Sequence, residues 1–93
     1  MTTQTTKVIF KRLQDDVIAL FPALPGTRDP YSTCMSYMHT GRHGHASTAI
    51  FALPAAQPAE YAELQKELES IGYTLRIAHR ATRYDLIARK RAM

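Results

Sequence analysis

Disulfides and membrane-spanning runs are both missing from this sequence. Its 93 residues include one cysteine and no tryptophan. A single cysteine cannot form an internal disulfide, which excludes a disulfide scaffold and suits a reducing compartment. No apolar stretch reaches the roughly 20 residues that cross a bilayer, and the polar start (residues 1–6) lacks the order of a secretory signal. We therefore expect a cytoplasmic protein that makes no contact with a membrane.

The sequence signatures of common enzymes are also missing. There is no nucleophile elbow and no glycine loop followed by the lysine that holds a phosphate. Cys34 could form a thiolate–imidazolium pair with a nearby histidine, but a lone cysteine is more often a small buried apolar residue. The sequence therefore predicts a protein that binds a partner and does not catalyse a reaction.

The composition that is present predicts a folded chain of one domain. The hydrophobic fraction is 45% and the charged fraction 22%, which is typical of a globular protein. We expect one domain over residues 1–93, with residues 1–6 as a flexible tail. A chain of this length buries one small core.

Four segments are expected to be strands. Residues 7–13 and 17–21 are rich in β-branched and aromatic residues and should form an antiparallel hairpin across an aspartate turn. Residues 32–39 and 73–80 follow, and the second of these alternates apolar and polar side chains. Residues 40–45 are expected to be a glycine-containing loop. Residues 46–53 fit a strand, a helical turn or an apolar loop.

Two segments are expected to be helices. In residues 58–71, one face carries Tyr61, Leu64, Leu68 and Ile71, and Gly72 follows as a stop. The second helix opens with Thr82 as its cap and Asp85 three residues later, which resembles a capping box. In that helix, Tyr84, Ile87 and Ala88 are expected to pack on the core.

This order predicts an α+β domain of two layers. The elements run β-β-β-α-β-α, with an antiparallel sheet of about four strands and both helices packed on one side. An edge strand could pair with a second copy, so the sequence leaves monomer and homodimer open.

A histidine cluster is one candidate site. His39, His43 and His45 are close in sequence, and imidazole binds zinc and other transition metals well. Cys34 is a poor fourth ligand, because its odd separation from His39 puts the two on opposite faces of a strand. Either these three residues bind a metal ion, or His39 packs in the sheet and the other two lie in an exposed loop.

Charge predicts a second candidate site. The net charge is +4, but residues 57–72 carry −3 and residues 73–93 carry +5. Arginine binds phosphate with a planar fork and stacks on bases, and Tyr31 and Tyr37 would add stacking faces if they are exposed. The residues expected to contact nucleic acid or a nucleoprotein partner are Arg76, Arg80, Arg83, Arg89, Lys90 and Arg91. The glycine-aromatic signature of the RNA-recognition fold and the GxxG clamp of KH domains are missing.

A third possibility needs no motif. A small domain with one polar sheet face can act by occluding a host protein, and the sequence neither shows nor excludes this. It remains an alternative to nucleic-acid binding and to metal binding.

Several motifs together resemble a group of short bacterial proteins carried on plasmids, conjugative elements and phages. The resemblance covers roughly residues 7–91, and the segments that carry it are 8–10, 17–22, 24–26, 34–37, His39, 41–44, 60–61, Leu64 and 67–73. Arg42 departs from the pattern, since that position is usually glutamine in the group. The resemblance implies no particular activity. It implies a setting among accessory genes of mobile DNA, in which an inhibitor of host defence is a reasonable alternative.

Overall fold

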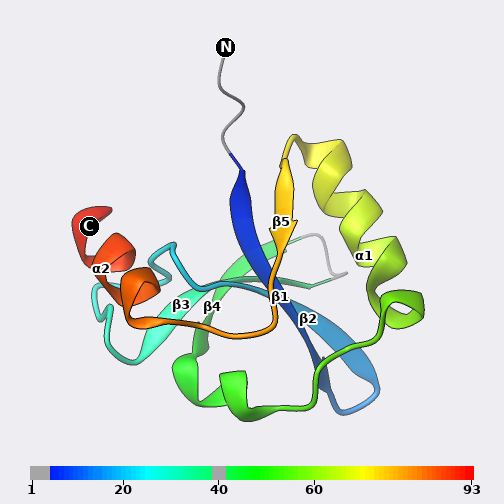
Figure 1. Ribbon diagram of the computed structural model, residues 1–93, viewed down its shortest axis with the longest axis horizontal. Coiled ribbons are helices and arrows are strands. Elements are labelled where there is room, and N and C mark those ends of the chain that lie inside the picture. Colours follow the sequence, from blue (N-terminus) through cyan, green and yellow to red (C-terminus); the bar gives the residue numbers. More distant parts are fainter. Residues whose placement is uncertain (1–4, 39–41) are drawn as a thin grey trace.

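In the part of the chain that the structure describes, five strands form one sheet, and two α-helices and one short 3-10 helix accompany it. The computed structural model describes residues 5–38 and 42–93. Figure 1 shows the elements, which in chain order are β1 (Thr6–Leu13), β2 (Asp16–Phe21), β3 (Thr33–Met38), β4 (Arg42–Ser47), η1 (Thr48–Ala52), α1 (Pro58–Ile71), β5 (Leu75–Ile77) and α2 (Arg83–Arg91). The strands form one sheet in the order β4-β3-β2-β1-β5.

The α+β class, the two layers and the order of the predicted elements are confirmed. The predicted hairpin is present, because β1 pairs antiparallel with β2 and Ile9 lies opposite Leu20. β1 begins at Thr6, whose amide donates to the carbonyl of Thr74, so the sheet includes the last residue of the expected tail. Residues 1–4 lie outside the described residues.

β4 corrects the prediction of a loop for residues 42–45, and residues 40 and 41 lie outside the described residues. It pairs antiparallel with β3, so that His43 lies opposite Tyr37 and Ala46 opposite Cys34. An edge strand has one partner and tolerates polar side chains, which explains why its sequence has no apolar pattern. Residues 46–53, which the sequence leaves ambiguous, divide between the end of β4 and η1.

β5 makes the sheet mixed, which corrects the prediction of an antiparallel sheet. It pairs parallel with β1, and Lys7 lies opposite Arg76. A parallel neighbour needs a crossover connection, usually a helix, and here the chain reaches β5 through α1.

The main core lies between α1 and one face of the sheet. Leu64 and Leu68 of α1 are fully buried there, and the ring of Tyr61 stacks on Phe10 with centroids 4.3 Å apart. The strand residues of this cluster are Val8, Phe10, Val17, Ala19, Phe21 and Tyr37. The predicted apolar face of α1 is confirmed except at Ile71, which is exposed in the last turn.

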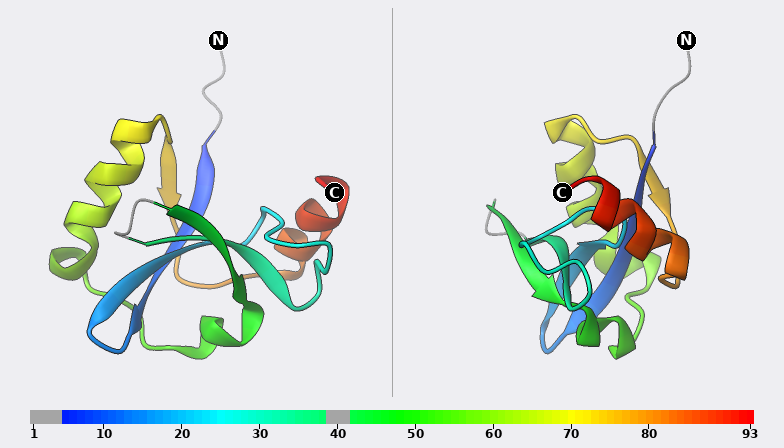
Figure 2. Two further views of the ribbon diagram at one scale, coloured as in Figure 1. Left: turned by 180° about the vertical axis from the view of Figure 1, so that it is seen from behind. Right: turned by 90° about the vertical axis from the view of Figure 1, so that its left-hand side faces the viewer.

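The opposite face of the sheet has its own apolar cluster. It consists of Ile9, Ile18, Leu20, Cys34 and Ala46, and Ile50, Phe51, Ala78 and Ala81 pack against it. α2 meets the sheet on this side, since its Asp85 bonds Lys7, which points away from the core residue Val8. α1 alone packs on the main core and forms the second layer, whereas α2, which was predicted beside it, lies at the opposite end of the molecule (Figures 1 and 2).

Membrane-spanning segments were also searched for in the structure. Within residues 5–38 and 42–93, no helix has the length and apolar character needed to cross a bilayer.

We expect alanine at Gly26 to destabilise the fold and alanine at Gly44 to be tolerated. A Cβ on Gly26 would collide with the backbone carbonyl of Cys34 and lie 2.7 Å from the Cβ of His45. Overpacking of this kind lowers the free energy of unfolding by about 1–3 kcal/mol. A Cβ on Gly44 would meet only Ser36 Oγ, at 3.6 Å. Urea denaturation of Gly26→Ala and Gly44→Ala measures the difference, and equal stability of the two variants would contradict it.

Candidate nucleic-acid interface

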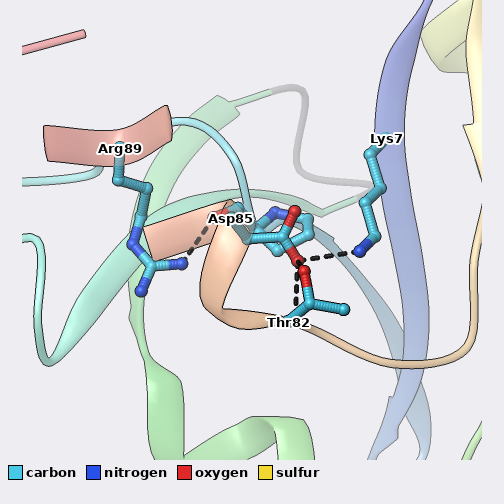
Figure 3. A network of polar contacts seen from close by, with 5 residues as sticks. Lys7, Thr82, Asp85 and Arg89 are labelled. Atoms are coloured by element: carbon cyan, nitrogen blue, oxygen red, sulfur yellow. Dashed lines mark hydrogen bonds and ion pairs between the residues drawn. The ribbon is translucent and has the colours of Figure 1, made fainter. Parts of the chain in front are cut away.

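The inner side of α2 is held to the rest of the chain by polar bonds. Asp85 is buried, and its Oδ2 lies 2.7 Å from Lys7 Nζ on β1 (Figure 3). The same oxygen accepts a hydrogen bond from the amide of Thr82, also at 2.7 Å. The predicted capping box is therefore confirmed, and its carboxylate also bonds a lysine from the other end of the chain.

Arg89, one turn further along α2, makes the second attachment. Its side chain is only 5% exposed, and Nε donates to the carbonyl of Pro30 at 2.8 Å. Another guanidinium nitrogen donates to the carbonyl of Pro22. Arg89 is therefore held mainly by contacts inside the protein, and its predicted contact with a partner stays a prediction that its 5% exposure does not favour.

The outer side of α2 carries the residues that face solvent. Its exposed side chains are Arg83, Tyr84, Ile87, Lys90 and Arg91, which we call the outer arc. At 3.6 residues per turn, these five positions fall within about 120° of the helix circumference, and Asp85 and Arg89 lie on the other side. A stripe with this spacing normally packs on a core. Here it is exposed, so the expectation that Tyr84 and Ile87 pack inside is wrong.

Three of the predicted binding residues thus come together on the outer arc: Arg83, Lys90 and Arg91. Arg76 is exposed and lies opposite Lys7 in the sheet, so its side chain is on the face that α2 approaches. Arg80 is exposed in the segment between β5 and α2. Neither of the ion pairs Lys7–Asp85 and Arg12–Glu60 between described residues involves one of these five cations.

Two exposed tyrosines flank this charge. Tyr31 is 64% exposed, as the stacking hypothesis requires, and Lys90 Nζ lies 5.3 Å from its ring centroid. Tyr84, which the sequence reasoning assigned to the core, is 67% exposed, and the Arg83 guanidinium lies 5.4 Å from its ring. Tyr37 is only 2% exposed, so it offers no stacking face to a ligand. The sequence could not have shown that Tyr84 is exposed, because its helical spacing with Ile87 and Ala88 favours packing on the core.

The histidine cluster is only partly described. His43 and His45 point to the same face of β4, and His43 Nε2 lies 2.7 Å from the hydroxyl of Tyr73. His39 lies outside the described residues. Within the part of the chain that the structure describes, no three His, Cys, Asp or Glu side chains are grouped as metal ligands. The three-histidine metal site therefore stays a prediction.

Next to His43, tyrosines are held in their neutral form. The Tyr37 hydroxyl donates to Glu67 Oε1 at 2.8 Å, and this bond, with burial second, raises the pKa of Tyr37. Burial raises the pKa of Tyr73. Phenols with raised pKa values are weaker acids and stay protonated over a wider pH range. The His43 ring packs edge-on against Tyr37 at 4.9 Å between centroids. The contacts that hold these side chains are therefore those of sheet packing.

Comparisons with known proteins add no functional information. The chain has no significant match among protein-family models, curated proteins or solved structures. The function has to be argued from the side chains themselves.

We expect Arg89→Met to destabilise the protein and Arg91→Met to leave it nearly unchanged. Removing the Arg89 donors leaves the carbonyls of Pro22 and Pro30 without these partners, which costs about 1–3 kcal/mol. Arg91 is exposed, and surface changes of this kind stay within about 0.5 kcal/mol. Urea denaturation of the two variants provides the measurement. Equal losses would show that Arg89 is not a structural residue.

Alkaline unfolding should report on Cys34. Burial raises the pKa of this thiol from 9.0 to about 11, and nearby Arg89 opposes the shift. Folding thus favours the neutral thiol. Its contribution to the free energy of unfolding is fully present below pH 9 and is lost as the pH rises through 11. We expect the free energy of unfolding to fall less steeply over this range in Cys34→Ala, by at most about 1.4 kcal/mol per pH unit. Parallel pH profiles of the parent and the variant would count against this.

Proposed function

We propose that this chain is a small binding protein that contacts nucleic acid, free or within a nucleoprotein complex, through the outer arc of α2. The observation that carries the proposal is the reversed orientation of α2. The helix directs its buried polar pair, Asp85 and Arg89, at the protein, and its basic, aromatic and aliphatic side chains at solvent.

The charge of the outer arc supports an anionic partner. Arg83, Lys90 and Arg91 come from one helix face, and Arg76 and Arg80 belong to the segment that leads into it. A cation without a carboxylate partner keeps its full attraction for phosphate, and binding releases the counterions of the nucleic acid. Arginine also bonds phosphate with two parallel donors, which lysine cannot do.

The apolar members of the outer arc support the same partner. Ile87 is 43% exposed and lies among the cations, next to Tyr84 on the helix surface. These two side chains would not contribute to a surface that binds phosphate by charge alone. They can contact nucleic-acid bases, which present flat apolar faces between the phosphates. The resemblance to proteins of plasmids, conjugative elements and phages is compatible with the proposal, because mobile DNA provides nucleoprotein partners.

Binding to a mixed-sequence oligonucleotide should weaken steeply with salt. Fluorescence anisotropy across a range of ionic strengths gives the slope of log affinity against log salt. Each lost phosphate contact should reduce that slope by about 0.7 to 0.9. We therefore expect a shallower slope for Arg83→Gln and for Arg91→Gln.

The matched control is Lys66→Gln. Lys66 is exposed on α1, at the far end of the molecule, and its loss changes the net charge by the same amount. We expect this variant to bind with the slope of the parent. Absence of binding at low ionic strength would reject the proposal, and equal slopes for all three variants would reject the assignment to α2.

A further inference from the structure

Two of the five tyrosines differ from the others in their surroundings. Tyr37 packs against His43, Tyr61 stacks on Phe10 and Tyr73 stacks on Phe21. Tyr31 and Tyr84 have no aromatic neighbour among the described residues and are each about two-thirds exposed. Their ring partners are instead the cations of Lys90 and Arg83. These two rings therefore contribute little apolar burial to the fold.

The two rings belong to the two ends of the outer arc. Tyr84 is in the first turn of α2, and Lys90, which lies beside the Tyr31 ring, is in the last. Lys90 is six positions after Tyr84, which is about 9 Å along the helix axis. Ile87 lies between them on the same side of the helix. The surface thus consists of an aromatic ring with its cation, an aliphatic centre, and a second ring with its cation.

We infer that the ligand of this surface is a single-stranded nucleic acid whose bases stack on Tyr31 and Tyr84. This inference rests on the proposed function and narrows it to one class of nucleic acid. Stacking of a base on an aromatic side chain contributes about 1–3 kcal/mol and tolerates any base. A cation lies over one face of each ring, so the base would stack on the other face and the cation could bind the phosphate of that nucleotide.

A duplex fits the same surface poorly. Its bases stack on one another and are unavailable to a tyrosine ring without unpairing. Reading a duplex through its major groove needs side chains that bond the base edges, most often arginine, asparagine or glutamine. Of these residue types the outer arc has Arg83 and Arg91 but no asparagine or glutamine, and its centre is Ile87. On a duplex, Ile87 would lie against phosphates, and an apolar side chain gains no favourable interaction from such a contact.

An abasic oligonucleotide separates stacking from charge, because it keeps the phosphates and lacks the bases. Each stacked base should tighten binding by about 5- to 160-fold, so we expect a single-stranded oligonucleotide to bind more tightly by at least this factor than an abasic one of equal length at the same salt, and more tightly than the matching duplex. Equal affinity for all three would overturn this inference while leaving phosphate binding intact. Binding to none of them would instead overturn the proposed function.

Substitution of the rings gives the second arm of the experiment. Tyr84→Ala and Tyr31→Ala should each lose most of the preference for the base-containing strand, and their affinity for the abasic strand should not change. Tyr84→Phe keeps the ring and should bind like the parent. Both tyrosines are exposed, so these variants should unfold at the same urea concentration as the parent. An unchanged preference in both alanine variants would overturn the assignment of the rings.

The lack of tryptophan makes a direct optical test possible. Tyr84→Trp introduces a single indole at the proposed stacking position. Its emission should be quenched by the base-containing strand and not by the abasic strand. Unquenched emission at saturating single strand would place the bases elsewhere and overturn the inference for Tyr84.

Discussion

The position of α2 depends on the ion pair between Lys7 and Asp85. The pair joins the first strand to the last helix, and the two side chains are only 10% and 8% exposed. Charges so far removed from water are costly unless each has a partner, so separating the pair would leave two unpaired buried charges. Together with Arg89, which bonds two carbonyls in the connection between β2 and β3, this contact decides which side of α2 faces solvent. Every functional proposal made for the outer arc follows from that orientation.

The two helices illustrate two ways of attaching a helix to a sheet. α1 buries Leu64 and Leu68 and is held by removal of apolar surface from water, a non-directional force. α2 buries a carboxylate and a guanidinium, whose hydrogen bonds are directional and fix the rotation of the helix. Because these polar bonds hold α2 in place, Tyr84 and Ile87 are not needed to attach the helix and are exposed to solvent.

The sequence was informative wherever the deciding contacts are local. The stripe on α1, the capping box at Thr82 and Asp85, and the β1–β2 hairpin are confirmed, and all three arise from residues close together in the chain. β4 was missed because a polar edge strand has no apolar alternation. The orientation of α2 was missed because Lys7 is 78 residues from Asp85, and the carbonyl partners of Arg89 are 59 and 67 residues away. Helical spacing shows that a helix has two sides and cannot tell which one a distant partner will cover.

The acidic and basic side chains are concentrated at different ends of the molecule, which gives it an electric dipole. Glu63 and Glu69 are exposed on α1, and α2, whose exposed cations are Arg83, Lys90 and Arg91, lies at the other end of the molecule (Figure 1). The electric field of a polyanion would rotate the protein so that α2 faces the polyanion before contact. Productive collisions would then be more frequent than random tumbling allows, and added electrolyte would slow capture by shortening the distance over which this alignment acts.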